Sequence, residues 1–172
     1  ANFGGGGEKQ NPKIKGIWHL FILKKVPSVL KYIAKYLAPR DEDSMSDEAK
    51  ALRVRVMLRV GVFGIPLIAK LDESAASMAA NIPEGSCQWK VKPDGPTMHL
   101  VKEKGEFHAS KGDMETPSAK VDFKDMPAAL GVLTGKKDGM KAMMSGDLAI
   151  TGQTQIAMML MPLQAKLGKA MK

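Results

Sequence analysis

Residues Ala119 to Leu167 read AKVDFKDMPAALGVLTGKKDGMKAMMSGDLAITGQTQIAMMLMPLQAKL. This pattern predicts, in order, a strand, a short helix, a Gly-Lys turn, a second short helix, a Ser-Gly-Asp turn, another strand and a long apolar helix. Almost every inward position is Met, Leu, Ile, Val or Ala, and seven of the chain's thirteen methionines lie between Met140 and Met171. Because Met is unbranched and polarizable, a methionine-rich lining adapts to ligands of irregular shape. The segment therefore indicates a cavity for an apolar ligand.

Glycine and proline interrupt the helices of this segment. Asp125 and Asp138 are expected to cap the two short helices, Gly135 and Gly146 end them, and Pro162 falls within the last helix. Short interrupted helices pack less completely than long regular ones, which favours a void between them. An ordinary solid core is the alternative, because apolar stripes at helical spacing usually are core. The side chains expected to face inward and to line the cavity are Met126, Leu130, Leu133, Met140, Met143, Met144, Leu148, Ile150, Ile156, Met159, Leu160 and Leu163.

Upstream of this segment the hydrophobic period changes from about 3.6 residues to about 2. Cys87, Trp89 and Val91 alternate with polar residues, which is typical of a half-buried strand. The same alternation predicts further strands around residues 98–100, 107–109, 119–123 and 148–150. The sequence therefore predicts five strands in all, mixed with helices.

The N-terminal part of the chain has a different character. Four consecutive glycines lie near the start, and a basic helix is expected over residues 46–60. Gly61 and Gly64 weaken that helix, and Pro66 is well placed to open a new one, so a boundary is expected near Gly64. These features divide the chain into a disordered tail over 1–13, a basic helical extension over 14–63 and an α+β domain over 64–172.

The charge of the chain favours an acidic partner. It has 26 Lys and Arg against 18 Asp and Glu, a net charge of +8. The basic residues of 14–63 are expected to contact an anionic membrane surface or an acidic protein, and a merely solvated face is equally consistent with them. Aromatic residues are few and no nucleic-acid-binding motif accompanies the charge, so nucleic acid is not expected as a partner.

Two further features bear on location. The apolar run over residues 17–23 is too short to cross a bilayer, which takes about 20 residues. The single cysteine, Cys87, forms no internal disulfide and fits a reducing compartment. We therefore expect a cytoplasmic protein that is peripheral at a membrane.

Catalytic chemistry has little support in the sequence. His19, His99, His108 and Cys87 show no metal-binding spacing such as H-x-x-x-H or C-x-x-C, and Cys87 occupies an inward strand position that suits a small hydrophobe. We therefore expect no enzyme, no metal and no cofactor. The Gly135-Lys136-Lys137 turn is a candidate for holding a phosphate or carboxylate head group, although solvated charge is the commoner explanation of such a turn.

The order of elements from residue 66 to 167 resembles the sterol carrier protein 2 family, the non-specific lipid-transfer proteins. The resemblance is strongest at Leu133-Thr134-Gly135-Lys136 and at Gly146-Asp147-Leu148-Ala149-Ile150-Thr151-Gly152, which match that family's "tGk" turn and "G-x-L-x-I-x-G" strand. It implies an α+β fold with a five-stranded, mostly antiparallel sheet covered by helices on one face. It also implies an apolar tunnel for fatty acyl chains, acyl-CoAs, sterols or similar lipids. Residues 14–63 lie outside that family's core domain.

The residues and the resemblance together predict a protein without catalytic activity. It binds, transfers or presents an apolar ligand of a fatty acyl, sterol-like or isoprenoid kind in a hydrophobic tunnel. The alternative is an accessory subunit of an enzyme complex, which presents or shields an apolar substrate and docks through residues 14–63.

Overall fold

The computed structural model describes residues 42–170, with side chains over 43–166. The expected tail over 1–13 and the part of the extension before residue 42 lie outside the described residues. In the described residues, a 3-10 turn at Glu42–Ser44 is followed by five helices and five strands. No helix of the described part is long and apolar enough to cross a membrane.

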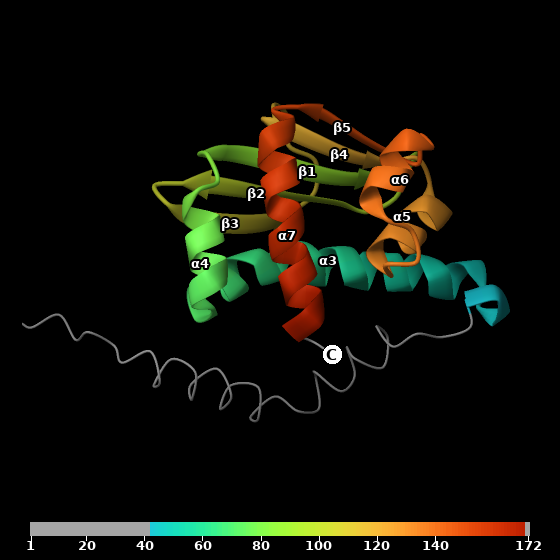
Figure 1. The fold of residues 1–172 in the computed structure, drawn as a ribbon. Helices are drawn as coiled ribbons and strands as arrows, with labels where there is room; N and C mark the ends of the chain where they lie inside the picture. Colours follow the sequence, from blue (N-terminus) through green and yellow to red (C-terminus); the bar gives the residue numbers. More distant parts are fainter. Residues whose placement is uncertain (1–41, 171–172) are drawn as a thin grey trace, which may run out of the picture.

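The strands form one five-stranded sheet in the order β3-β2-β1-β4-β5. β1 pairs with β4 in parallel, and the other three pairings are antiparallel. The helices cover one face of this sheet (Figure 1). The predicted α+β fold with a mostly antiparallel sheet is therefore confirmed. The strands are β1 (Gly85–Val91), β2 (Thr97–Glu103), β3 (Glu106–Lys111), β4 (Ala119–Phe123) and β5 (Leu148–Gly152).

The inner face of the sheet is apolar. Successive side chains of a strand point to opposite faces, so apolar residues at every second position gather on one face. Trp89 on β1 lies opposite Met98 on β2 and Val121 on β4, and all three are buried. Val91 and Phe123 are paired one step further along β1 and β4 and are buried too. The alternation seen in the sequence thus becomes one continuous apolar floor.

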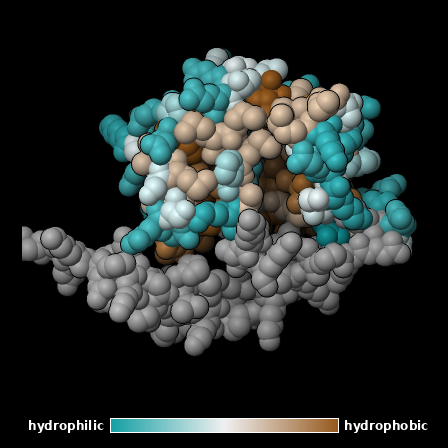
Figure 2. Space-filling view, viewed as in Figure 1, coloured by the Kyte–Doolittle hydropathy of each residue, from teal (hydrophilic) through white to brown (hydrophobic). Residues whose placement is uncertain are grey.

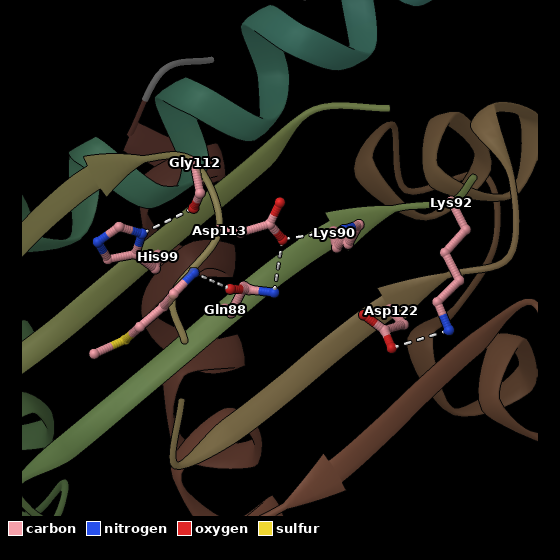
Figure 3. Close-up of polar contacts among 8 residues, drawn as sticks. Gln88, Lys90, Lys92, His99, Gly112, Asp113 and Asp122 are labelled. Atoms are coloured by element: carbon pink, nitrogen blue, oxygen red, sulfur yellow. Dashed lines mark hydrogen bonds and ion pairs between the residues drawn. The ribbon is translucent and has the colours of Figure 1, made fainter. Parts of the chain in front are cut away.

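The opposite face is polar and carries the segment that joins β3 to β4 across β2 and β1 (Figure 3). His99 bonds to the carbonyl of Gly112 through Nδ1 at 2.9 Å, and Lys90 forms an ion pair with Asp113 at 3.0 Å. Gln88 accepts a hydrogen bond from the backbone N–H of Met114 at 2.6 Å. These bonds hold the crossing segment on the sheet and leave the apolar floor to the helices.

α3 (Asp47–Leu71) is one continuous helix, so the expected break at Gly61 and Gly64 is wrong. Pro66 lies inside the helix instead of opening a new one. Tertiary packing outweighs the local cost of these residues, since helices in proteins are stabilised mainly by burying one face. Val54 and Leu58, before Gly64, are buried in the same core as the residues after it. The expected domain boundary therefore falls in the middle of a core helix.

The remaining helices are short, apart from the last. They are α4 (Glu73–Ala80), α5 (Met126–Leu133), α6 (Gly139–Met144) and α7 (Thr154–Ala170). The predicted caps are confirmed: Asp125 accepts from the N–H of Ala128 at 2.8 Å, and Asp138 accepts from the N–H groups of Met140 and Lys141. Figure 1 shows α7 lying across the sheet, between α4 and the α5–α6 pair.

Candidate lipid cavity

A cavity of about 690 Å³ lies between the inner face of the sheet, the α5–α6 turn and α7. Figure 2 shows a recess with apolar residues inside it, between α7 and the α5–α6 pair. The residues that line its apolar part are Trp89, Val121, Phe123 and Leu148 from the sheet, Val132 and Leu133 from α5, and Met161 and Ala165 from α7. Small-molecule sites in proteins have volumes of about 300–1,000 Å³, so the cavity is of a size that holds one ligand.

The rim of the cavity is polar and mostly basic. It is formed by residues 134–139 together with Lys141 and Gln164. Lys137 forms an ion pair with Asp147, and the Ser145 hydroxyl donates to the same carboxylate at 3.1 Å. The hydrogen bond from Lys137 and then that from Ser145 hold the pKa of the Asp147 carboxyl below its usual range. The cavity thus combines an apolar floor with a charged edge.

The chain makes a tight turn at this rim. Gly135 follows α5 with a φ of +77°, which a residue with a side chain rarely adopts. Thr134 closes the helix end by donating its hydroxyl hydrogen to the carbonyl of Leu130 at 2.7 Å. Gly139, at the start of α6, lies so close to α7 that an added Cβ would come within 2.8 Å of Met161 Cε. Gly135 therefore supplies the left-handed turn, and Gly139 lies against the end of the Met161 side chain of α7.

The structure brings only some of the predicted lining residues to this cavity. Leu133 and Leu148 line it. Leu130, Ile156, Leu160 and Leu163 are buried in the solid core, and Met126, Met143, Ile150 and Met159 pack against that core while partly exposed. Met126 and Leu130 also border a second cavity, of about 570 Å³, between α5 and the start of α3. These eight residues therefore do not line this cavity, and their role in binding a ligand stays a prediction.

Two of the predicted inward side chains point outward. Met140 is 54% exposed and Met144 is 87% exposed, so their predicted inward orientation is wrong. α6 has only six residues, and the wholly buried Ala142 is its one fully inward position. In so short a helix, residues on the far side from the buried one face solvent, whatever their hydrophobicity.

Several wall residues were not predicted as part of the site. Trp89, Val121 and Phe123 were expected only as inward positions of strands. Their shared register, with Trp89 opposite Val121, places them on the floor between α5 and α7. The alternation of apolar residues along each strand marks these three side chains as inward. Placing them side by side also requires the parallel pairing of β1 with β4, which the spacing of residues does not predict.

The described residues offer little for catalysis. Burial raises the pKa of the Cys87 thiol to about 12, so it is not ionised at neutral pH and is a poor nucleophile. In the part of the chain from 42 to 170, no group of three or more His, Cys, Asp or Glu side chains is placed to hold a metal ion. What the cavity does offer is an apolar floor, made by Trp89, Val121 and Phe123, that suits an apolar guest.

Comparison with known proteins identifies the family of the chain. Residues 66–165 match the SCP-2 sterol transfer family, which confirms the family that the motifs resemble. Solved structures similar to the chain include the ubiquinone synthesis protein UbiJ-SCP2, with a TM-score of 0.49, 12% identity and coverage of 65% of this chain and 95% of that one. Sterol carrier protein 2 like 2 from Aedes aegypti has a TM-score of 0.42 and 15% identity, with coverage of 62% of this chain and 95% of that one. Sterol carrier protein 2 from Yarrowia lipolytica has a TM-score of 0.44 and 16% identity, with coverage of 59% of this chain and 88% of that one. Among curated proteins, none matches the chain.

Proposed function

The chain belongs to the SCP-2 sterol transfer family, and from this premise we propose that it binds the apolar chain of a lipid in the cavity between the sheet, the α5–α6 turn and α7. The ligand is of a fatty acyl, sterol-like or isoprenoid kind, and the protein carries or presents it without making or breaking a bond. The observation that carries this proposal is the apolar floor formed by Trp89, Val121 and Phe123 beneath a cavity of about 690 Å³.

The energetics suit a carrier. Burying one CH₂ group contributes about 0.8 kcal/mol, so a chain of about sixteen carbons gains on the order of 12 kcal/mol gross. A bilayer offers the same chain nearly the same gain. Transfer between membrane and protein is then close to balanced, and neither an acid, a base nor a nucleophile is needed for it.

Filling the cavity tests the proposal. Ala165 lines the cavity from α7 and is exposed at its edge, so Ala165→Trp adds bulk there without disturbing the core. Ala76→Trp on α4, at an exposed position outside the cavity lining, is the matched control. We expect Ala165→Trp to weaken binding of a fluorescent fatty acid by about tenfold or more, which is about 1.4 kcal/mol, while Ala76→Trp binds as the wild type does. Unchanged binding by a folded Ala165→Trp variant would contradict the proposal.

A second candidate function is that of an accessory subunit of an enzyme complex, which presents or shields an apolar substrate. It is favoured by the outer face of α3, which exposes Leu52, Phe63 and Leu67 beside the basic residues Arg55 and Arg59. Exposed apolar side chains interleaved with positive charge suit an acidic protein surface. All of these residues except Leu67 lie within the segment 14–63, through which docking was expected.

Two surface variants test this second function. If the protein is an accessory subunit, the wild type in native extract should elute from size exclusion with its enzyme, at high mass. Phe63→Ser or Leu67→Ser on the outer face of α3 should shift the protein to the elution position of the free chain. Fatty acid binding should persist in both variants. Elution of the wild type at its own size at every salt concentration would argue against an accessory subunit.

A further inference from the structure

α6 presents an apolar face to solvent beside the cavity. Met144 is 87% exposed and Met140 is 54% exposed, and they lie four residues apart on the same side of the helix. A single exposed apolar side chain needs no explanation, but two adjacent long ones on a helix of six residues form a small continuous surface. Met is also the apolar residue that adapts best to irregular contacts.

Exposed lysines belong to the same part of the chain as these methionines. Lys141 is exposed on α6 itself, and Lys124 is exposed beside Asp147, to whose carbonyl its backbone N–H donates at 2.9 Å. The acidic groups of the segment are engaged internally. Asp138 caps α6, and Asp147 is held by Lys137 and Ser145. The outward charge of this surface is therefore basic.

The position of this surface links it to the cavity. Lys136, Gly139 and Lys141 line the cavity rim, so the exposed methionines stand at its edge on the same short helix. We infer that the α6 patch, made of Met140, Met144, Lys124 and Lys141, docks the protein on an anionic lipid bilayer. The methionines enter the interface and the lysines meet anionic head groups, as in other interfacial segments. This inference rests on the proposed function, because a rim docked on the bilayer would let the lipid's apolar chain pass into the cavity without crossing water.

A bilayer fits the α6 patch better than a folded partner does. A stable protein interface buries about 800 Å² on each side through about 20–30 residues, whereas this patch has four. A bilayer needs no matching shape, and the flexible side chains of Met and Lys suit a fluid surface. The expected contact is therefore weak, reversible and sensitive to salt.

The test is co-sedimentation of the full chain with two kinds of vesicle, one of phosphatidylcholine alone and one of phosphatidylcholine mixed with phosphatidylglycerol. The wild type should bind the anionic vesicles, and rising salt should reduce that binding. The double variant Met140→Ser, Met144→Ser should lose about tenfold in vesicle affinity. Met158→Ser, which removes an exposed methionine from α7 outside the cavity lining, is the matched control and should bind vesicles as the wild type does.

A second readout separates this inference from the proposed function. Binding of a fluorescent fatty acid in solution should be unchanged in the double methionine variant, because neither side chain lines the cavity. Loss of vesicle binding in Met158→Ser, equal vesicle binding in all variants, or no binding of the wild type to anionic vesicles would each overturn docking through α6. Vesicle binding without any fatty acid binding would instead leave docking intact and refute the lipid cavity.

Discussion

Gly152 shows how a single residue fixes the geometry of the sheet. It ends β5 with a φ of +77°, and a Cβ at this position would collide with the carbonyl oxygen of Ser118. The backbone N–H of Gln153, the next residue, donates to that same carbonyl at 2.8 Å. The chain therefore leaves β5 close against β4 and turns into α7, which forms one wall of the cavity.

A pair of alanine variants measures this constraint. Gly152→Ala should lower the free energy of unfolding by about 2–3 kcal/mol, because it adds a steric collision to an unfavourable φ. Gly105→Ala is the control: Gly105 has a φ of +78° but nothing within 4 Å of an added Cβ. It should cost about 1 kcal/mol, from the backbone alone. Urea denaturation of both variants gives the comparison, and equal losses would show that the close approach to Ser118 has no energetic weight.

Among the elements, the α3–α4 corner is tied to α7 by Asp72. Its carboxylate caps α4 by accepting from the N–H of Ala75 at 2.7 Å, and it forms an ion pair with Lys166 of α7 at 3.0 Å. The hydrogen bond from Ala75 and then that from Lys166 hold the pKa of this carboxyl below its usual range. Asp72 thus connects three helices, including α7, which forms one wall of the cavity.

The lowered pKa makes this contribution dependent on pH. Because the ionised form is stabilised only in the folded state, its contribution is complete above the unfolded pKa, close to the ordinary value of 3.8, and is lost as pH falls through the lower folded pKa. Asp72→Ala should therefore cost about 1 kcal/mol near pH 7, a typical value for an N-cap. The difference between variant and wild type in urea denaturation should shrink below pH 4. A difference that stays constant down to acid pH would refute the ionic part of this account.

The sequence predicted those elements whose signal is local. The strands followed from alternation in residues such as Cys87 and Trp89, and the helix starts followed from Asp125 and Asp138, whose carboxylates bond within three residues. It failed at Pro66, because burial of Val62 and Ile65 in the core outweighs the local preference to end a helix. It failed at Met144, because a helix of six residues has too few turns for hydrophobic periodicity to mark its inner side.

At the scale of the whole molecule, α3 belongs to the same core as the sheet. Val54, Leu58 and Val62, all before Gly64, are buried with exposures of 0–1%. Fully burying a side chain of this size contributes about 1.5–3 kcal/mol, and whole domains are stable by only about 5–15 kcal/mol. Residues 66–165, the part that matches the family, are therefore not expected to be a complete folding unit in this protein.

Two truncations test this expectation. A chain of residues 42–172 should unfold cooperatively on heating, followed by circular dichroism, because it keeps α3 whole. A chain of residues 64–172 should lack a cooperative transition, because it loses the three buried side chains and most of α3. Equal melting of the two would restore the boundary expected near Gly64 and make the first half of α3 an attachment.

In the proposed function, the apolar chain of the ligand enters the cavity above Trp89. The chain has two tryptophans, so Trp18→Phe leaves Trp89 as the sole indole emitter, and Trp89 is 4% exposed on the cavity floor. Bromine quenches indole fluorescence only at contact. Titration of this variant with a fatty acid brominated along its chain should quench Trp89 to saturation at one ligand per protein, whereas the unbrominated acid should not. Equal emission with the two acids at saturating concentration would contradict the claim.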